Sequence, residues 1–327
     1  MRTPVSDPLR VGPYRIVGRL GSGGMGWVYL GRSASGRALA VKVVRPELAS
    51  DPQFRSRFAR EVEAARAVSG AFTAAVVDAD TEGEPPWLAT LYVAGPSLAE
   101  AVRTDGPLAE AEVRRLGAGL VEALQAIHAV GVVHRDLKPA NVLLAEDGPR
   151  VIDFGISLFG GSSSITTVGT VMGTPPFMSP EQFKGELVGP PSDVFSLGAV
   201  LAFAATGNAP FGSGTGVLYR VLHDLPSLES VPAGLRRLVE RCLAKNPADR
   251  PTTAALLDEL ATEAAPVPVW PPPTIAENIQ SRKDDLATRN HSRGSVASVP
   301  SCLLLHAQAL LDAGLTDRMV AEAVGRG

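Results

Sequence analysis

The feature that most constrains this chain is the stretch at residues 134–141, which reads His-Arg-Asp-Leu-Lys-Pro-Ala-Asn. Its proline argues against ordinary helix, so the acid, the lysine and the amide are held at fixed offsets on irregular backbone. A second motif, Asp-Phe-Gly at residues 153–155, follows a short apolar run. Two acids and an amide brought together can accept a proton from a hydroxyl group and hold a divalent metal. Either motif alone is weak evidence, but both in this order are strong evidence for one site.

A glycine-rich segment lies near the N-terminus, between two patterns typical of strands. Residues 21–28 read Gly-Ser-Gly-Gly-Met-Gly-Trp-Val. Glycines allow backbone amides to approach phosphate groups closely. The spacing also fits a dinucleotide fingerprint or a plain turn, but a strand pattern rather than a helix follows it, and the ending of a Walker loop is missing. The segment therefore favours a hairpin that covers a nucleotide.

Lys42 lies inside an apolar strand pattern at residues 38–44. Burial of a lone ammonium group is costly, so we expect a partner for it. Residues 51–68 predict a helix that begins with an Asp-Pro pair, and this helix carries Glu61 and Glu63. We predict that Glu61 is the partner. Alternatively, Lys42 lies in water on an edge strand. The glutamates can likewise be solvated helix charges, and at least one of the two must be.

The remaining patterns predict a small antiparallel sheet with one main helix, followed by a mostly helical part. The strand patterns end at residues 87–93, before a Gly-Pro break, and long helical patterns follow, among them residues 108–130. Asp193 is predicted to cap a buried helix over residues 194–206. Arg250 is a candidate buried partner for Glu181, in a structural rather than a catalytic pair.

Residues 156–179 show no periodicity and carry many hydroxyl groups. They are either a plain surface loop or a segment that phosphorylation orders. A phosphate adds about −1.5 to −2 charges, which an arginine can pair with, and Arg135 is placed to do so. The candidate phosphorylation sites are Thr166, Thr167 and Thr170.

Length and composition limit the classes of protein. The 327 residues carry a net charge of −3 with a pI near 6.0, which argues against general nucleic-acid binding and a polybasic membrane-surface role. No signal core is present near the N-terminus, and the apolar run at residues 194–205 is shorter than the roughly 18 residues of a membrane span. Cys242 and Cys302 lack metal-ligand spacing. We therefore expect a soluble cytoplasmic protein with free thiols.

On these motifs the chain resembles the bacterial Hanks-type (eukaryotic-like) serine/threonine protein kinases, over about residues 12–262. The sequences of three stretches, at residues 61–66, 173–182 and 193–198, are similar to those of actinobacterial kinases of the AfsK type. The resemblance implies an α+β, two-lobed protein-kinase-like fold with ATP in the cleft. It also implies transfer of the γ-phosphate to serine or threonine hydroxyls of proteins in bacterial signal transduction, with autophosphorylation of the activation loop.

The resemblance divides the chain into four segments. Residues 1–11 are a lead-in, and residues 12–264 are a kinase domain with an N-lobe at 12–93 and a C-lobe at 94–264. Residues 265–299 are expected to be a disordered proline-rich and polar linker. Residues 300–327 are expected to form an amphipathic helical tail. This tail replaces the transmembrane helix and sensor domain, or the repeat propeller, of many relatives, which argues against a membrane-bound or ligand-sensing role.

The resemblance also implies roles for single residues. Asp136 orients the substrate hydroxyl and takes its proton, and Lys138 steadies the γ-phosphate. Lys42 holds the α and β phosphates and is braced by Glu61. Asn141 and Asp153 bind Mg²⁺, with Mn²⁺ as the alternative. The nucleotide site implied as a whole comprises Leu20, Gly21, Ser22, Gly23, Gly24, Met25, Gly26, Val28, Ala40, Lys42, Glu61, Thr90, Leu91, Val93, Asn141 and Asp153.

The expected partners are protein substrates and a second copy of the chain, which acts in trans and pairs through the small lobe. Two other functions fit the motifs less well. A pseudokinase that binds ATP as a regulatory module would usually lack the lysine, the base or a metal acid, and none is lacking here. A kinase for small molecules would not need Lys138-Pro139 or the Gly173 to Glu181 segment, which argue for protein substrates. Ser179 departs mildly from the family pattern, in which alanine precedes Pro180.

Overall fold

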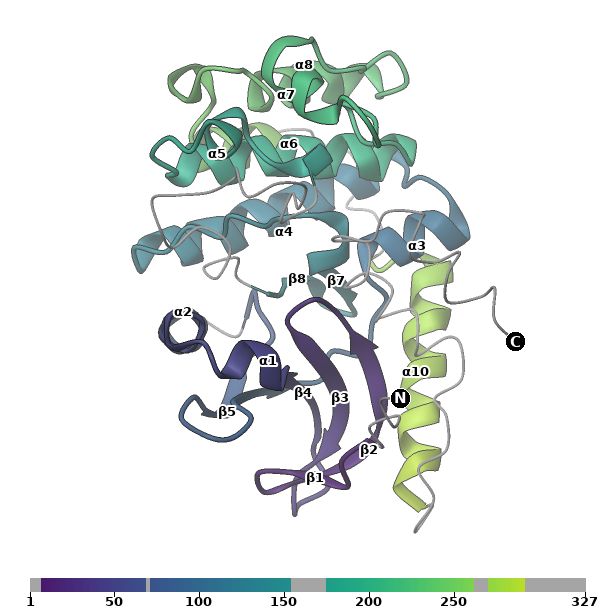
Figure 1. The fold of residues 1–327 in the computed structure, drawn as a ribbon. Helices are drawn as coiled ribbons and strands as arrows, with labels where there is room; N and C mark the ends of the chain where they lie inside the picture. The colour runs from purple at the N-terminus through teal and green to yellow at the C-terminus, as the bar shows by residue number, and fades with distance from the viewer. Residues whose placement is uncertain (1–6, 69–70, 154–174, 262–269, 292–327) are drawn as a thin grey trace, which may run out of the picture.

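The N-lobe is built on one six-stranded antiparallel sheet (Figure 1). The computed structural model describes residues 7–68, 71–153, 175–261 and 270–291. The strands follow the order β1-β2-β3-β4-β6-β5. Their bounds are β1 Arg10–Val11, β2 Tyr14–Ser22, β3 Gly26–Arg32, β4 Ala38–Val44, β5 Val76–Asp80 and β6 Trp87–Leu91. Since β1 pairs with β2, the sheet begins inside the segment that the sequence suggested as a lead-in.

Two helices, α1 (Pro46–Ala49) and α2 (Pro52–Ala67), lie between β4 and β5. The Asp51 carboxylate caps α2 by accepting a hydrogen bond of 2.8 Å from the Gln53 amide. Phe54, Phe58 and Val62 form one buried stripe of α2. The predicted helix at residues 51–68 is therefore confirmed, and its packing fixes which way Glu61 points.

The C-lobe is mostly helical, with one short hairpin facing the cleft (Figure 1). Its core lies around α4 and α6, and α6 is buried on nearly all sides. In the part of the chain that the structure describes, no helix is both long and apolar enough to span a bilayer. The bounds are α3 Leu98–Asp105, α4 Glu110–Ala129, η1 Pro139–Asn141, β7 Val142–Ala145, β8 Gly148–Val151, η3 Pro175–Phe177, α5 Pro180–Lys184, α6 Pro190–Thr206, α7 Val217–His223, α8 Ala233–Cys242, η4 Pro247–Asp249 and α9 Thr253–Ala261.

The prediction that Asp193 caps the buried helix is wrong, because α6 begins earlier. A Gly-Pro-Pro sequence allows the helix to start at Pro190, with Gly189 at the N-cap. Asp193 therefore lies within the first turn. Its fully buried carboxylate faces the segment that contains Asp136, as described below.

The prediction of a disordered linker over residues 265–299 is wrong for the part that forms helix α10 (Pro273–His291). This helix runs beside both lobes, from the level of α3 to the outer end of the sheet (Figure 1). Ile275, Ile279, Arg282 and Leu286 recur at helical spacing on its packed face. The buried surface of this face offsets the ordering entropy that a polar segment alone could not.

Other predictions concern residues outside the described part of the chain. These are the candidate phosphorylation sites Thr166, Thr167 and Thr170 and the tail helix at 300–327. They stay predictions.

Candidate active site

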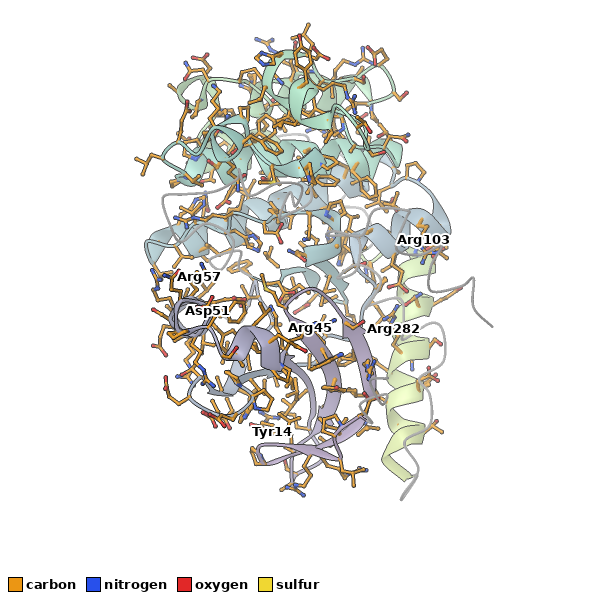
Figure 2. All side chains as sticks on the ribbon, in the orientation of Figure 1. Tyr14, Arg45, Asp51, Arg57, Arg103 and Arg282 are labelled. Carbon is orange, nitrogen blue, oxygen red and sulfur yellow. The ribbon has the colours of Figure 1, made fainter. Side chains whose placement is uncertain are left out.

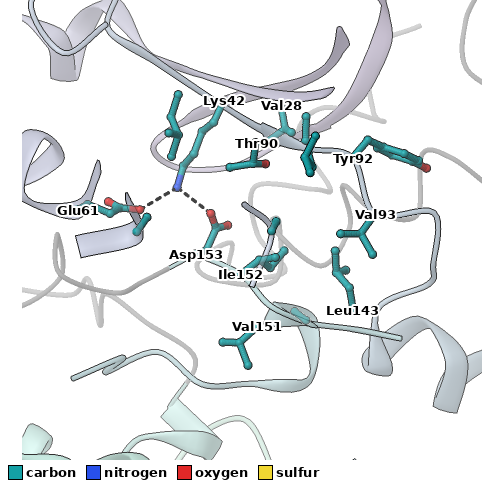
Figure 3. A pocket seen from close by; sticks show the side chains of 16 residues that line it. Val28, Lys42, Glu61, Thr90, Tyr92, Val93, Leu143, Val151, Ile152 and Asp153 are labelled. Carbon is teal, nitrogen blue, oxygen red and sulfur yellow. Dashed lines mark hydrogen bonds and ion pairs between the residues drawn. The ribbon is translucent and has the colours of Figure 1, made fainter. Parts of the chain in front are cut away.

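An open cavity of about 840 Å³ lies between the sheet and the C-lobe hairpin (Figure 3). Eight of the residues that the sequence assigns to a nucleotide site line it: Val28, Ala40, Lys42, Glu61, Thr90, Leu91, Val93 and Asp153. The structure adds eight lining residues that the motifs did not indicate: Ala65, Ala74, Leu88, Tyr92, Ala140, Leu143, Val151 and Ile152.

Lys42 stands at the back of this cavity, between two carboxylates. Its Nζ atom donates hydrogen bonds to Glu61 Oε1 at 3.4 Å and to Asp153 Oδ1 at 3.1 Å (Figure 3). The first contact confirms Glu61 as the partner of Lys42. Glu63 instead pairs with Arg66 on the exposed face of α2. The register of β4 and the buried face of α2 therefore separate two glutamates that lie only two residues apart.

Electrostatics in the cavity favour the charged forms of this cluster. Burial alone lowers the pKa of Lys42, but the charges of Asp153 and Glu61 outweigh it and raise the pKa. Burial alone raises the pKa of Asp153, but Lys42 above all, with Lys138 and His134, outweighs it and lowers the pKa. Lys42 and Asp153 are thus both ionised at neutral pH.

A second polar cluster forms around Asp136. The Asp136 Oδ2 atom forms an ion pair with Lys138 Nζ at 2.9 Å and accepts a hydrogen bond from Asn141 Nδ2 at 3.1 Å. The Asn141 Nδ2 atom also donates to the Asp136 backbone carbonyl at 2.9 Å. The irregular backbone that the proline imposes, followed by the short η1 turn, brings these three side chains together.

The loop that carries Asp136 is held by residues that sequence reasoning did not assign to the site. Asp193 accepts hydrogen bonds from the His134 amide at 2.9 Å and from the Arg135 amide at 2.8 Å. Arg135 adopts a φ of 67°, and its carbonyl accepts a hydrogen bond of 2.7 Å from Gln182 Nε2. A non-glycine residue in this conformation needs such support, because it is strained.

His134 links this loop to Asp153. Its Nδ1 atom accepts a hydrogen bond from the Asp136 amide at 3.2 Å, so the proton lies on Nε2, which donates to the Ile152 carbonyl at 3.2 Å. Burial lowers the pKa of His134, and this outweighs the raising effect of Asp193 and Asp136. His134 is therefore a neutral connector, and it positions the two acids relative to each other.

Asn141 and Asp153 fit a divalent metal. The Oδ1 atom of Asn141 is buried and has no hydrogen-bond partner among the described residues. The amide nitrogen of the same side chain donates two hydrogen bonds to Asp136. A buried oxygen in this state suits a hard cation, as does an ionised carboxylate. Within the described ranges, no cluster of three or more His, Cys, Asp and Glu side chains could hold a metal.

The glycine-rich hairpin is formed by the end of β2 and the start of β3. Gly26 must be glycine, because a Cβ atom there would lie 1.9 Å from the Val43 carbonyl oxygen. The Gly23 amide donates to the Gly26 carbonyl at 2.8 Å and closes the turn. Apart from Val28, the predicted residues of this segment do not line the described cavity, and neither does the buried Leu20.

Arg250 and Glu181 form the predicted buried pair, away from the cavity. Arg250 Nη1 and Nη2 donate to Glu181 Oε1 and Oε2 at 2.6 and 2.8 Å. Ser192 donates to the same carboxylate at 2.5 Å. Burial alone raises the pKa of Glu181, but the hydrogen bonds from Arg250 and Ser192 outweigh it and lower the pKa. This pair joins α5 to the segment before α9 and stabilises the C-lobe.

A two-lobed fold with this cleft and these two polar clusters defines a protein kinase. The family model described as "Protein kinase domain" matches residues 14–260, and the chain belongs to this family. The structure is similar to a crystal structure of the Mycobacterium tuberculosis PknI kinase domain, with a TM-score of 0.62 and 28% identity, covering 79% of this chain and 100% of that chain.

The chain is similar in sequence to curated actinobacterial proteins. The chain is 55% identical over 277 residues to "Probable serine/threonine-protein kinase PkwA" of Thermomonospora curvata, covering 84% of this chain and 37% of PkwA. It is also 55% identical over 258 residues to "Serine/threonine-protein kinase AfsK" of Streptomyces coelicolor, covering 78% of this chain and 32% of AfsK. The chain thus spans about a third of the length of these relatives.

Proposed function

We propose that this chain is an ATP-dependent serine/threonine protein kinase. The observation that carries the proposal is the Asp136 carboxylate, which both Lys138 and Asn141 contact, in a cleft that also holds Lys42 between Glu61 and Asp153. Family membership and the printed names of the relatives support it.

In the proposed reaction, a serine or threonine oxygen of the substrate bonds to the γ-phosphorus of ATP, and the bond from that phosphorus to the β–γ bridging oxygen breaks. Asp136 orients the hydroxyl group and accepts its proton. Lys138, which lies 2.9 Å from this carboxylate, stabilises negative charge on the transferred group. ADP leaves with the bridging oxygen.

Lys42 is proposed to bind the α and β phosphates. Its charge is ensured by Glu61 and Asp153, so phosphate oxygens would meet an ammonium group that is already oriented. Asn141 and Asp153 would hold Mg²⁺, or Mn²⁺, which supplies positive charge to neutralise the phosphates when bound. The glycine-rich hairpin of β2 and β3 would cover the nucleotide, and the backbone at 91–93 would meet the adenine, with Thr90 behind it.

The proposed substrates are proteins, including a second copy of this chain. We propose that the copies phosphorylate each other at Thr166, Thr167 or Thr170, and that Arg135 contacts the resulting phosphate.

Phosphosite mapping by mass spectrometry tests the proposal, after the purified protein is incubated with ATP and Mg²⁺ beside its Asp136→Ala variant. We expect phosphate on at least one of the three threonines in the wild type only. Equal phosphorylation of both proteins would overturn the role of Asp136. No phosphate in either, together with tight nucleotide binding, would favour an ATP-binding regulatory module.

A further inference from the structure

Helix α10 contacts both lobes on the outer side of the molecule, away from the cavity lining (Figure 1). Its anchorage on the C-lobe is extensive. Ile275 and Ile279 are 1% and 3% exposed and belong to the C-lobe core. Just before the helix, Trp270 Nε1 donates to the Ala145 carbonyl at 2.9 Å. This end of α10 is therefore part of the C-lobe.

The middle of α10 contacts α3 through a buried ion pair. Arg282, labelled in Figure 2, is 1% exposed and donates to Glu100, which is 5% exposed. Asn278 Oδ1 accepts a hydrogen bond from Arg282 Nε at 2.6 Å and orients the guanidinium group. Glu100 lies in the first turn of α3, which Ser97 caps. The backbone of Ser97 in turn forms an isolated antiparallel β-bridge with Leu143, which lines the cavity.

The other end of α10 reaches the N-lobe. Arg32, the last residue of β3, donates from Nη2 to the Leu286 carbonyl at 2.6 Å. The same strand carries Val28, which lines the cavity. Helix α10 thus contacts α3 on the C-lobe side of the cleft and β3 on the N-lobe side.

The two attachments use different contacts. The C-lobe attachment buries Ile275 and Ile279 and includes the hydrogen bond from Trp270, and the N-lobe attachment includes the hydrogen bond from Arg32 to the Leu286 carbonyl. Burial raises the pKa of Glu100 although Arg282 opposes this, so the ion pair only partly offsets the cost of burying its charges.

We propose that α10 is an interlobe strap that holds β3 at the distance from α3 at which Lys42 reaches Asp153, and that release of this strap weakens nucleotide binding. The measurements of KM and kcat rest on the proposed function, whereas the role of α10 as a strap does not. Arg282 and Arg32 are positioning residues in this account, because they act through the lobes and do not line the cavity.

Two single variants and one double variant test the strap. Arg282→Met leaves Glu100 buried without its partner, and we expect at least a fivefold weaker affinity for Mg-ADP by calorimetry, in the range of typical coupling between sites, about 5- to 150-fold. Hydrogen exchange in α10 should accelerate at the same time. The double variant Arg282→Met/Glu100→Leu replaces the ion pair by apolar side chains and should restore both properties. Glu277→Gln, on the exposed face of α10, is the matched control and should change neither.

Arg32→Gln tests the N-lobe contact, and it also decides the outcome if Arg282→Met does not fold. It should weaken Mg-ADP binding and raise KM for ATP more than it lowers kcat. Unchanged Mg-ADP affinity in Arg32→Gln, or in a folded Arg282→Met variant whether or not exchange in α10 accelerates, overturns the strap. A wild type that binds Mg-ADP and responds to these variants, yet transfers no phosphate, contradicts the proposed function and leaves the strap intact.

Discussion

Among the polar contacts that join the two lobes, one lies inside the cleft and one lies outside it. Inside, Lys42 of β4 reaches Asp153, directly after β8, at 3.1 Å. Outside, α10 connects β3 to α3 through Arg32 and Arg282. The inner contact lies where the proposed ligand binds, so phosphates and metal can replace it during turnover. The outer contact lies away from the cavity lining and can persist with or without nucleotide.

The two places also differ in how well their charges are satisfied. Lys42 has two carboxylates, and their charges raise its pKa despite burial. Glu100 is hydrogen-bonded to Arg282 and also lies in the field of Arg103, yet burial still raises its pKa. The Glu181–Arg250 pair, inside the C-lobe, resembles the inner contact, because several hydrogen bonds lower the pKa of Glu181. A fully hydrogen-bonded pair stabilises a fixed arrangement, whereas a partly satisfied pair favours a contact that can open.

The largest effect is expected from loss of the inner contact. Lys42→Met removes the ammonium group and leaves Glu61 and Asp153 facing each other without it. Phosphate transfer should fall by about 10²- to 10³-fold or more, as for removal of a donor that stabilises transition-state charge. Initial rates with radiolabelled ATP measure this. Lys184→Met, whose side chain is 51% exposed, is the control and should keep the wild-type rate.

Loss of the within-lobe pair should affect stability rather than chemistry. Glu181→Gln leaves Arg250 buried with an uncompensated charge, and we expect the free energy of unfolding to fall by about 3 kcal/mol. Urea unfolding followed by circular dichroism measures it. Glu186→Gln, at an exposed position of the same segment, should change it by less than about 0.5 kcal/mol. Equal effects of the two variants would show that the pair contributes nothing.

The choice between the two glutamates of α2 allows a finer test. Glu61→Gln weakens the orientation of Lys42, and the transfer rate should fall by about 10- to 100-fold, less than for loss of the lysine itself. Glu63→Gln affects only an exposed pair with Arg66 and should leave the rate unchanged. Equal losses in both variants would contradict the geometry of Lys42.

The smallest effect expected is a difference in pH dependence. The pKa of Glu181 is lowered, so its contribution to stability is complete above the ordinary value of 4.5 and is lost as the pH falls through the folded value. The stability gap between wild type and Glu181→Gln should therefore shrink in acid. The pKa of Glu100 is raised, so its contribution should instead decrease as the pH rises above 4.5. Urea titrations of wild type, Glu181→Gln and Glu100→Gln at several pH values measure both slopes, and slopes of the same sign would contradict the comparison.

The sequence predicted half of the residues that line the cavity, mainly through short motifs with fixed offsets. Lys42 and Glu61 could be paired in advance because a charge in an apolar strand needs a partner. The supporting contacts were not predictable in this way. Asp193 was recognised as a helix-start acid, but its hydrogen bonds to the His134 and Arg135 amides join segments almost 60 residues apart, and no local pattern encodes them.

The sequence analysis missed helix α10, because it gave the polar, proline-rich composition of residues 265–299 more weight than the helical spacing of their apolar residues. Three prolines at 271–273 open this stretch and polar and charged residues dominate the rest, and the position that continues the Ile275–Ile279 stripe is Arg282. An arginine reads as a solvated residue unless its partner is known, and Glu100 lies in a different helix. The spacing of Ile275, Ile279, Arg282 and Leu286 was the available signal, and it required that a buried arginine be allowed in an apolar stripe.

The most direct test of the central claim is a parallel measurement of ATP affinity and phosphate transfer for the wild type and Asp136→Asn. We expect both proteins to bind Mg-ATP with similar affinity, because Asp136 does not line the cavity. We also expect only the wild type to transfer phosphate to serine or threonine of a protein substrate. Transfer by Asp136→Asn at the wild-type rate, or ATP binding by the wild type with no transfer to any protein, would contradict it.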